Sequence, residues 1–370
     1  QMIMQENGLI RVGMNADELS EKISHYDVIG IHSNFTPQTS MVFEVARLAK
    51  LQGKKVIAGG VNARAMADRF FASGLFDDVC LTEGENDIQL MLWGKKDSII
   101  RQNLDSLPFP AWDKLPFHLY DEIMSPHGID LTVHERYAPM MTSRGCPFYC
   151  AYCHISTEKG GIGDLRLKSV DRVTQEIEVL KGLGVRKIFI EDDSLLAKKA
   201  RVKEIFKAVK NSGLTVADVN GVNLVHFFHK TDKLEPDVEY MRFLYDSGFK
   251  QIVFPVESGS QRILDNYASS KLNLKKMDVV NLTKIASEIG IICPVNMMIG
   301  FPDETEQEVM QSVELAKRLV DAGAPYVTFF IPVPFPGSKL FDMAIQKGYL
   351  KEDFDPYLMN WKNGVMENTV

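Results

Sequence analysis

Short apolar runs alternate with amphipathic stretches of helical length along most of this 370-residue chain. In the first quarter the runs are 27–31, 55–58 and 78–81, and each predicts a strand that is followed by a helix. Strands that are joined by helical crossovers pair in parallel, so the pattern predicts an α/β fold. A second series of six strands is expected at 139–143, 187–191, 215–221, 250–256, 291–299 and 326–331.

The helices of the second series are read from apolar residues at helical spacing. The clearest is 305–322, where Val309, Val313, Ala316 and Val320 are expected to share the buried face. Six βα units fit either an open doubly wound sheet or a partial βα barrel. In both folds the ligand-binding residues lie at the carboxyl ends of the strands.

A proline-punctuated aromatic segment, 107–116, interrupts the alternation and predicts a linker between two domains. A length of 370 residues also exceeds what one hydrophobic core usually supports, about 250–300 residues. The predicted organisation is a Rossmann-like domain at 1–95, a linker at 96–137, a βα domain at 138–350 and the start of a C-terminal extension at 351–370.

Composition excludes several classes of protein. Hydrophobic residues make up 45% of the chain, which is typical of a globular protein and not of a disordered one. A net charge of −7 argues against nucleic acid as the main partner, and no apolar run approaches the ~18 residues of a membrane span. Five cysteines are too few for a disulfide framework and favour a reducing compartment, the cytoplasm.

Three of the five cysteines, Cys146, Cys150 and Cys153, fall on one loop after the first strand of the second series. Thiolates bind soft metals, and three of them can each bind one iron of a cubane cluster. A fourth iron without a protein ligand would then be open to a reactant. Cys80 and Cys293 lie inside expected strands and are expected to be core residues.

Other roles for the cysteine loop fit its sequence less well. Zinc held by the three cysteines and His154 is disfavoured because adjacent residues chelate one ion poorly. The segment 150–154 also fits the haem-attachment pattern C-x-x-C-H, but that pattern requires an exported protein and leaves Cys146 unexplained. A redox pair would use only two thiols. Cysteines that serve only as small buried hydrophobic residues would not be expected in a loop such as Arg144-Gly-Cys-Pro147.

The pattern C-x-x-x-C-x-aromatic-C at 146–153, after the first strand of a βα domain, resembles the radical S-adenosylmethionine (SAM) enzymes. The resemblance implies that Cys146, Cys150 and Cys153 hold a [4Fe-4S] cluster whose fourth iron binds the amino and carboxylate groups of SAM. It further implies reductive cleavage of SAM to methionine and a 5′-deoxyadenosyl radical, which removes a hydrogen atom from substrate. Tyr152 matches the aromatic position that lies near adenine in this family.

Further matches follow the expected strands. The acidic segment Glu191, Asp192 and Asp193 resembles the one that holds the SAM amino group in this subgroup, although helix capping by Asp193 would explain one acid. Glu257 and Ser258 match the ribose-contacting segment, since a carboxylate can accept both ribose hydroxyls.

The last two strands carry weaker matches. The segment 297–305 looks like the Gly-x-Pro-x-Glu-Thr turn of the family, whose Glu304 and Thr305 are expected mainly to cap the next helix. Asn296, just before that turn, and Pro332, in a proline-rich closing loop, are implied to lie against the cofactor. His226 and His229 follow the third strand, where capping competes with a substrate-facing role.

The first domain resembles the cobalamin-binding domain of one large radical SAM subgroup. Its strand-end loops would face one another around the nucleotide tail, and the implied contacts are Ser33, Thr36, Gly59, Gly60, Glu83 and Gly84. The cobalt-coordinating motif Asp-x-His-x-x-Gly is missing, as it is in many members of the subgroup. Only three strands are readable before Gly94, fewer than the family domain usually has, which suggests a domain incomplete at its N-terminus and fits a start at Gln1 rather than Met.

The resemblance therefore implies a radical SAM enzyme, with cobalamin-dependent methylation of an unactivated carbon as the predicted reaction. The alternative within the subgroup is a radical rearrangement or oxidative cyclisation. Methylthiotransferases carry three further cysteines in their first domain, where this chain has only Cys80. The alternative of another class is a non-catalytic iron–sulfur electron carrier, which would need neither the acidic segment nor the Glu257 segment. The implied partners are a small-molecule or natural-product substrate and an electron donor such as flavodoxin or ferredoxin.

Overall fold

The protein is described from a computed structural model, which divides the chain into two compact units. The first unit contains Gln1–Ser98, Phe335–Gly337 and Lys351–Asn360, and the second contains Ile99–Pro334, Ser338–Leu350 and Trp361–Val370. The structure describes residues 2–4, 10–94, 103–121, 135–157, 164–229, 234–269, 271–359 and 364–367. Parts of the predicted linker, 95–102 and 122–134, lie outside the described residues, so the predicted domain boundaries stay a prediction.

The first unit is built on a parallel sheet of three strands in the order β3-β4-β5. Ile29 pairs with Val56 and Ile57 with Asp78, and the three strands match those expected from the sequence. Two further short strands, β1 and β2, pair antiparallel and were not predicted. The strands of this unit are β1 (Met2–Met4), β2 (Ile10–Val12), β3 (Val28–His32), β4 (Lys55–Gly59) and β5 (Asp78–Val79).

Helices pack on this sheet and complete a small core. The middle residues of β4 are buried, and Val42 and Ala46 of the helix after β3 lie in the same cluster. The helix predicted to follow the strand 55–58 is divided at Met66, which leaves the helical region with φ −116° and ψ 32°. The helices are α1 (Ala16–Ser24), α2 (Thr39–Leu51), α3 (Val61–Ala65), α4 (Ala67–Ala72) and α5 (Gly84–Trp93), with short 3₁₀ turns η1 (Thr36–Gln38) and η7 (Pro356–Leu358).

The second unit holds two parallel sheets, in the orders β11-β10-β9-β6 and β12-β13-β14, and a small antiparallel pair, β7 and β8. Neighbouring strands follow chain order, and a parallel bridge between Gln251 and Ile292 connects the two sheets. The strands are β6 (Tyr137–Met140), β7 (Ser143–Arg144), β8 (Arg166–Leu167), β9 (Lys187–Ile190), β10 (Thr215–Asp218), β11 (Phe249–Gln251), β12 (Phe254–Glu257), β13 (Val295–Met298) and β14 (Val327–Phe330).

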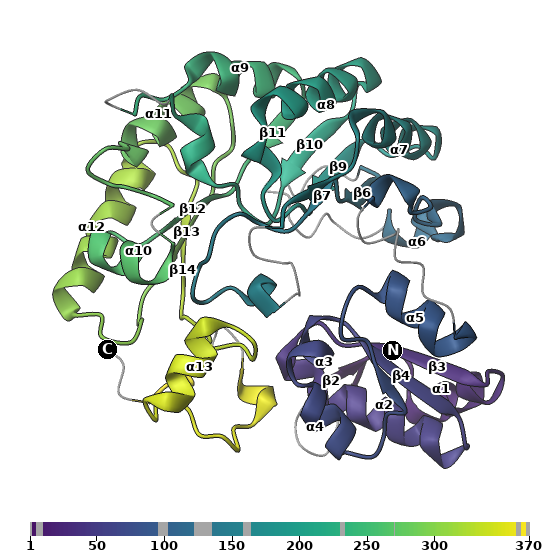
Figure 1. Ribbon diagram of the computed structural model, residues 1–370. Helices are drawn as coiled ribbons and strands as arrows, with labels where there is room; N and C mark the ends of the chain where they lie inside the picture. Colours follow the sequence, from purple (N-terminus) through teal and green to yellow (C-terminus); the bar gives the residue numbers. More distant parts are fainter. Residues whose placement is uncertain are drawn as a thin grey trace. The chain divides into compact units, whose positions relative to one another are not determined.

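Helices α7, α8, α9, α11 and α12 lie on the outer side of these strands (Figure 1). A doubly wound sheet would reverse its strand order at a switch point, whereas consecutive order with helices outside is that of a βα barrel. The predicted α/β fold is confirmed, with a partial barrel as its second part. The helices are α6 (Phe117–Tyr120), α7 (Val170–Gly182), α8 (Lys199–Ser212), α9 (Val238–Asp246), α10 (Gln261–Tyr267), α11 (Val279–Ile289), α12 (Glu306–Asp321) and α13 (Lys339–Gln346), with 3₁₀ turns η2 (Leu104–Ser106), η3 (Trp112–Lys114), η4 (His154–Thr157), η5 (Leu195–Ala197) and η6 (Leu224–Phe227).

The strand expected at 250–256 is divided in two. Oδ2 of Asp218, at the end of β10, accepts hydrogen bonds from the backbone N–H groups of Val253 (3.1 Å) and Gly221 (3.0 Å). A side chain thus takes the place of a strand partner at Val253, and β11 ends before it while β12 begins after it. Sequence periodicity cannot reveal such a replacement, because both halves remain apolar.

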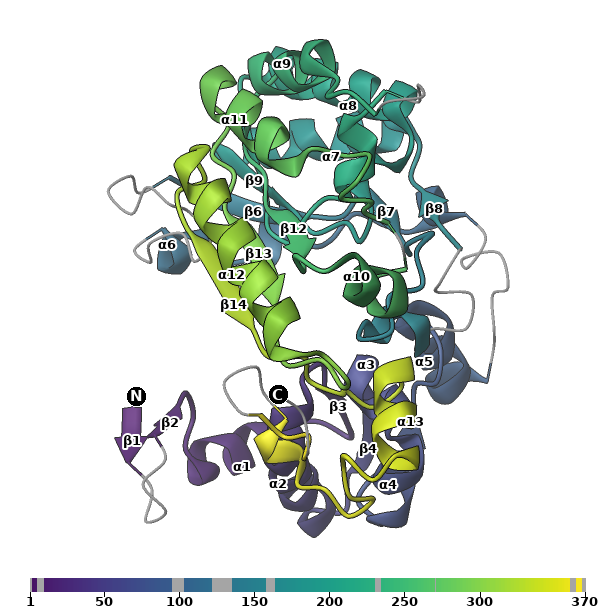
Figure 2. The same cartoon turned by 90° about the vertical axis from the view of Figure 1, so that its left-hand side faces the viewer.

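The buried face of α12, which runs alongside β14 in Figure 2, differs from the predicted one. Ala316 is buried as expected, but Val320 is 47% exposed and the prediction for it is wrong. The buried residues instead include the polar Glu308 and Ser312, which bind the loop after β12. Hydrogen bonds to that loop make their burial favourable, and an apolar pattern cannot show this.

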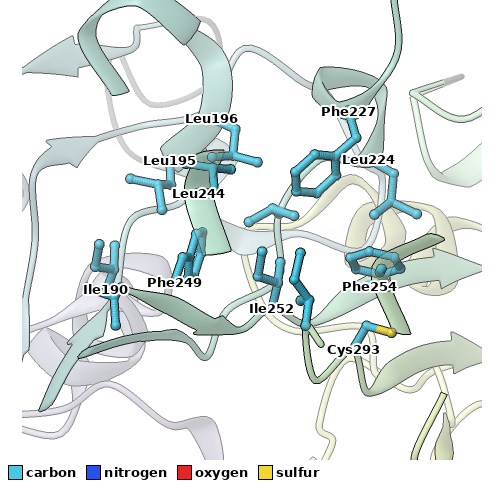
Figure 3. Packing of buried hydrophobic residues seen from close by; sticks show 14 of the residues in the cluster. Ile190, Leu195, Leu196, Leu224, Phe227, Leu244, Phe249, Ile252, Phe254 and Cys293 are labelled. Atoms are coloured by element: carbon cyan, nitrogen blue, oxygen red, sulfur yellow. The ribbon is translucent and has the colours of Figure 1, made fainter. Parts of the chain in front are cut away.

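The core of the second unit lies between the strands and the outer helices. Figure 3 shows Phe249, Phe254 and Phe227 packed with Leu244 in this cluster. Cys293 lies in the same cluster and is fully buried, and Cys80 is buried in the first unit, so both predictions of core cysteines are confirmed. Within the described residues, no helix is long and apolar enough to span a membrane.

Candidate functional site

The cysteine loop follows β6 and β7 and is held from two directions. On one side, Oδ2 of Asp193, just after β9, accepts a hydrogen bond from the N–H of Gly145 (2.9 Å). On the other side, Ala151 donates its N–H to the carbonyl of Tyr267 (2.7 Å), and Tyr149 donates to Oγ of Ser269 (2.9 Å). The loop is therefore fixed at the carboxyl ends of the strands, where a barrel places its active site.

The three thiols of the loop are largely shielded from water. Cys150 is 9% exposed, and Cys146 and Cys153 are half-buried. Burial raises the pKa of Cys150 and raises that of Cys153 to about 12. A buried thiolate is unfavourable unless a cation accompanies it, so these thiols suit a metal that displaces their protons.

The spacing of these side chains bears on the kind of metal. Among the described residues, no three His, Cys, Asp or Glu side chains converge closely enough to hold a single metal ion. In a cubane cluster each cysteine binds a different iron, so the three sulfurs need not converge on one point. The lack of a single-ion site among the described residues is therefore compatible with a cluster.

A buried polar triad lies beside the loop. The hydroxyl of Tyr152 donates a hydrogen bond to Oε1 of Glu257 (2.7 Å), and Nζ of Lys271 lies 3.1 Å from the same oxygen. The side chains of Lys271 and Glu257 are only 11% and 9% exposed. Burial raises the pKa of Tyr152, and the Glu257 carboxylate raises it further, so Tyr152 remains a hydrogen-bond donor. The Glu257 carboxylate thus already has two partners within the protein.

The three acids after β9 have different surroundings. Asp192 is 1% exposed, and its carboxylate accepts from the N–H and hydroxyl of Thr142 (2.5 and 2.6 Å) and from the hydroxyl of Ser143 (2.6 Å). Burial raises the pKa of Asp192, and these hydrogen bonds oppose that rise. Arg201 of α8 donates to the carbonyl of Thr142 (2.7 Å) and completes the support. Asp192 therefore stabilises the start of the cysteine loop, and its predicted contact with SAM stays a prediction.

Glu191 and Asp193 are less buried than Asp192. All three acids follow the end of β9 at Ile190, and Asn220 donates its side-chain N–H to the backbone carbonyl of Glu191 (2.9 Å). Asp192 binds the residues that begin the cysteine loop, whereas Asp193 accepts the N–H of Gly145. The three consecutive acids therefore do not share one role.

The loop after β12 is bound to α12. Ser258, fully buried, has its hydroxyl 3.3 Å from that of Ser312 and accepts the N–H of Ser260 (3.0 Å). Glu308 pairs with Arg262 at 2.6 Å, which lowers the pKa of Glu308 to about 2. The hydroxyl of Ser258 is thus engaged in holding this loop, and its predicted ribose contact stays a prediction.

The remaining predicted residues of this unit lie near the strand ends. Asn296 is half-buried on β13, on the face opposite the core residues Val295 and Met297. Pro332 is buried just after β14. Thr305 caps α12 as expected, whereas Glu304 does not: it accepts the N–H groups of Gly300 (2.6 Å) and Phe301 (3.0 Å) and so closes the preceding turn. His226 is half-buried in η6 and His229 is exposed.

In the first unit, the loops after β3 and β4 contact each other. Ser33 donates its N–H to the carbonyl of Gly59 (2.7 Å), and its own carbonyl accepts the N–H of Asn62 (3.1 Å). Gly60 has φ 97°, and an added Cβ would lie 2.5 Å from the carbonyl oxygen of Ser33, so glycine is required there. Ser33 and Thr36 are buried, and their predicted contact with a ligand stays a prediction.

Two asparagine side chains mark the same edge of this sheet. Asn62, three residues after β4, donates to the hydroxyls of Ser33 (2.9 Å) and Thr39 (3.1 Å). The side-chain oxygens of Asn62 and Asn86 are buried and accept no hydrogen bond from the described residues. Buried acceptors normally have a donor, so this edge suits a ligand that supplies one. Glu83 and Gly84, predicted contacts, lie three and two positions before Asn86 at the start of α5.

Sequence reasoning missed Lys271 and Asn62. A lysine in a polar loop normally has its ammonium in water, so the sequence gives no signal that Lys271 is buried against Glu257. Asn62 did carry a signal, because it follows the glycine pair at a strand end.

Comparisons with known proteins agree with this geometry. The family model described as the radical SAM superfamily matches residues 140–335, which is more than half of the chain. The cytidylyl-2-hydroxyethylphosphonate methyltransferase of Streptomyces wedmorensis is 26% identical over 99% of this chain and 76% of its own length. An uncharacterized methyltransferase of Pyrococcus horikoshii is 31% identical over 70% of this chain, which spans half of that relative's length.

Solved structures share the fold at low sequence identity. The radical S-adenosylmethionine methyltransferase TsrM of Kitasatospora setae, solved with cobalamin and a [4Fe-4S] cluster, superposes with a TM-score of 0.64 at 14% identity over 90% of this chain and 69% of its own. The cobalamin-dependent enzyme OxsB, solved with aqua-cobalamin and S-adenosylmethionine, has a TM-score of 0.68 at 14% identity over 94% of this chain and 57% of its own. With the match to the family model, the cysteine loop and the partial barrel, this chain belongs to the radical SAM superfamily of enzymes.

Proposed function

We propose that this radical SAM enzyme is a cobalamin-dependent methyltransferase that acts on an unactivated carbon of a small-molecule substrate. The observation that carries the proposal is the cysteine loop, held by Asp193 on one side and by the segment 267–269 on the other. Support for methylation comes from relatives named as methyltransferases, including the Streptomyces and Pyrococcus proteins. Only the class of the substrate is proposed, because the substrate site is shaped by loops that have no family-wide pattern.

In this proposal Cys146, Cys150 and Cys153 hold a [4Fe-4S] cluster, which fits a loop with three shielded thiols and no fourth protein ligand among them. The bound cluster supplies one electron that cleaves SAM to methionine and a 5′-deoxyadenosyl radical. Glu191 and Asp193, which are less buried than Asp192, offer carboxylates to the SAM ammonium group. Tyr152 offers its ring, which packs on Phe301 at 5.9 Å between centroids, as a wall for adenine.

Cobalamin is proposed for the first unit. The fit rests on the buried side-chain oxygens of Asn62 and Asn86, which have no donor among the described residues, at the carboxyl edge of β4 and β5. The nucleotide tail of cobalamin carries hydroxyl donors, so it suits this edge. TsrM and OxsB, both of which have the fold of this chain, were solved with cobalamin or aqua-cobalamin.

An electron donor is also part of the proposal, because each cleavage consumes an electron that the chain cannot supply. A flavodoxin or a ferredoxin has the required one-electron chemistry. A reducing cytoplasm would suit the described cysteines, none of which forms a disulfide.

The proposal is tested by anaerobic reconstitution of the full chain with iron and sulfide. We expect about four irons per chain and release of 5′-deoxyadenosine when SAM and a reductant are added. Cys150→Ala should abolish iron binding and cleavage together. Cys293→Ala, which removes a thiol from the core, serves as the control and should retain both.

Each part of the proposal can fail separately. One zinc and no iron would contradict the cluster, and four irons without 5′-deoxyadenosine would favour an electron carrier. A corrin absorption band that follows the protein through gel filtration supports cobalamin. If the band appears equally in an Asn62→Leu variant that is folded, the proposed edge is wrong.

A further inference from the structure

We propose that Lys271 is a positioning residue whose buried positive charge raises the reduction potential of the cluster held by the cysteine loop, in opposition to Glu257. This inference rests on the proposed function, because it requires a cluster at Cys146, Cys150 and Cys153. Lys271 is not among the residues that the family resemblance implied, and its role follows from its contacts.

The first support is burial. The ammonium of Lys271 lies 3.1 Å from the Glu257 carboxylate, and neither side chain is more than 11% exposed. Taking a lysine and a glutamate out of water is costly, and such pairs contribute little net stability on average. A buried pair beside a metal-binding loop is therefore better explained by its electrostatic effect on that loop than by stability.

The second support is the position of the pair against the cysteines. Glu257 accepts the hydroxyl of Tyr152, which lies directly before Cys153. The backbone from Tyr149 to Ala151 is bound to the segment 267–269, two residues before Lys271. Three contacts, at Tyr149, Ala151 and Tyr152, thus hold the cysteine loop on both sides of Cys150 against Glu257 and the segment just before Lys271.

The third support is the electrostatic reach of the pair. The Lys271 ammonium and the Glu257 carboxylate, 3.1 Å apart, both act on the sulfur of Cys150, with opposite sign. The ammonium also acts on the sulfur of Cys153. The charge of Lys271 therefore reaches two of the three proposed cluster ligands.

The fourth support is the backbone. Glu257 and Ser269 have φ values of 68° and 59°, and Asp303 is the only other residue outside glycine with a positive φ among those described. A left-handed conformation is unfavourable in such residues and persists where the surroundings enforce it. Glu257, the partner of Lys271, and Ser269, two positions before Lys271, are thus both held in place at an energetic cost.

These observations lead to a prediction of sign. Reduction adds negative charge to a cluster in surroundings of low dielectric, where a nearby cation favours the reduced form and a nearby anion disfavours it. Lys271→Met should therefore shift the midpoint potential to more negative values, and Glu257→Gln should shift it to more positive values. A purely structural role of Lys271 does not predict that the two substitutions shift the midpoint potential in opposite directions.

The experiment is a redox titration of the anaerobically reconstituted full chain, followed by electron paramagnetic resonance of the reduced cluster. Lys271→Arg keeps the charge and should stay close to the unsubstituted protein. Lys275→Met removes an exposed lysine four positions after Lys271 and is the matched control. It should not change the midpoint potential of the cluster. Iron content and melting temperature are recorded for every variant.

The outcomes are separable. An unsubstituted chain that binds no iron contradicts the proposed function itself. A chain that binds the cluster, with Lys271→Met at the same potential or with both substitutions shifting it in one direction, overturns the inference. If Lys271→Met does not retain iron, the test rests on the Glu257→Gln variant. A midpoint potential in that variant that is unchanged or more negative than in the unsubstituted chain overturns the inference.

Discussion

Tyr152 and Glu257 are 105 positions apart in the chain, yet the hydroxyl of Tyr152 donates a 2.7 Å hydrogen bond to the Glu257 carboxylate. The bond connects the cysteine loop to the end of β12. The cysteine loop is therefore positioned by a residue of a distant strand and not by its own sequence alone.

Removal of this bond should loosen the loop. Tyr152→Phe takes away a buried donor to a carboxylate, and we expect a loss of about 1.5–3 kcal/mol in the free energy of unfolding. The measurement is denaturant unfolding of the full chain. Tyr149→Phe makes the same change on the same loop at a residue that is 63% exposed, and it should leave stability unchanged. Equal effects of the two substitutions would contradict this account of the loop.

Substitutions of Asp192 and Asp193 should have separate effects, the first on stability and the second on binding of SAM. Asp192→Ala leaves the N–H of Thr142 and two hydroxyls without their acceptor in a buried site, and should cost about 3 kcal/mol or more. Asp193→Ala removes one hydrogen bond to Gly145 and should cost about 1 kcal/mol, while it weakens binding of SAM.

Urea unfolding measures the first effect, and equilibrium dialysis of SAM with the reconstituted proteins measures the second. A variant of Asp193 with normal SAM affinity would argue against the role proposed for its carboxylate. An Asp192→Ala protein as stable as the parent would argue against the supporting role of Asp192.

Asp218 should make stability depend on pH. Burial raises its pKa from 3.8 to about 7, and three backbone hydrogen bonds reduce that rise. The folded protein holds this proton more tightly than the unfolded chain, so the contribution of Asp218 is fully present below pH 3.8 and is lost as the pH rises through about 7. Asp218→Asn keeps an acceptor for Val253 and should remove this part of the pH dependence.

The check is the melting temperature of both proteins between pH 4 and pH 8. The difference between them should change across this range, with the asparagine variant gaining relative stability at the upper end. Parallel curves would mean that Asp218 has the same pKa in the folded and unfolded chain.

Gly259 should tolerate no side chain. An added Cβ would lie 2.5 Å from the backbone carbonyl of Gln311, where the loop after β12 meets α12. Gly259→Ala should therefore cost about 1–3 kcal/mol in the free energy of unfolding. Gly182→Ala, at the end of α7 with no atom within 4 Å of the added methyl group, should be neutral or stabilising by up to about 1 kcal/mol. Similar effects at both glycines would show that the loop can move away from α12.

Much of the fold could be predicted from the sequence because βα alternation is a local signal. The three strands of the first unit appear where the apolar runs predicted them. The errors occurred where polar side chains enter the interior. Asp218 divides a strand by binding Val253, and Glu308 shifts the buried face of α12 by binding Ser260. A polar residue becomes favourable in a core only when its partner is present, and that partner lies far away in the chain.

The family and the three clustered cysteines could be recognised from the sequence, because the eight-residue loop is contiguous and its spacing does not depend on tertiary contacts. The roles of the surrounding charges could not be recognised in this way. The fold buries Asp192 and leaves Glu191 and Asp193 more accessible, and it pairs Glu257 with Lys271 beside Cys150. These arrangements depend on contacts between distant loops, which no short stretch of sequence contains.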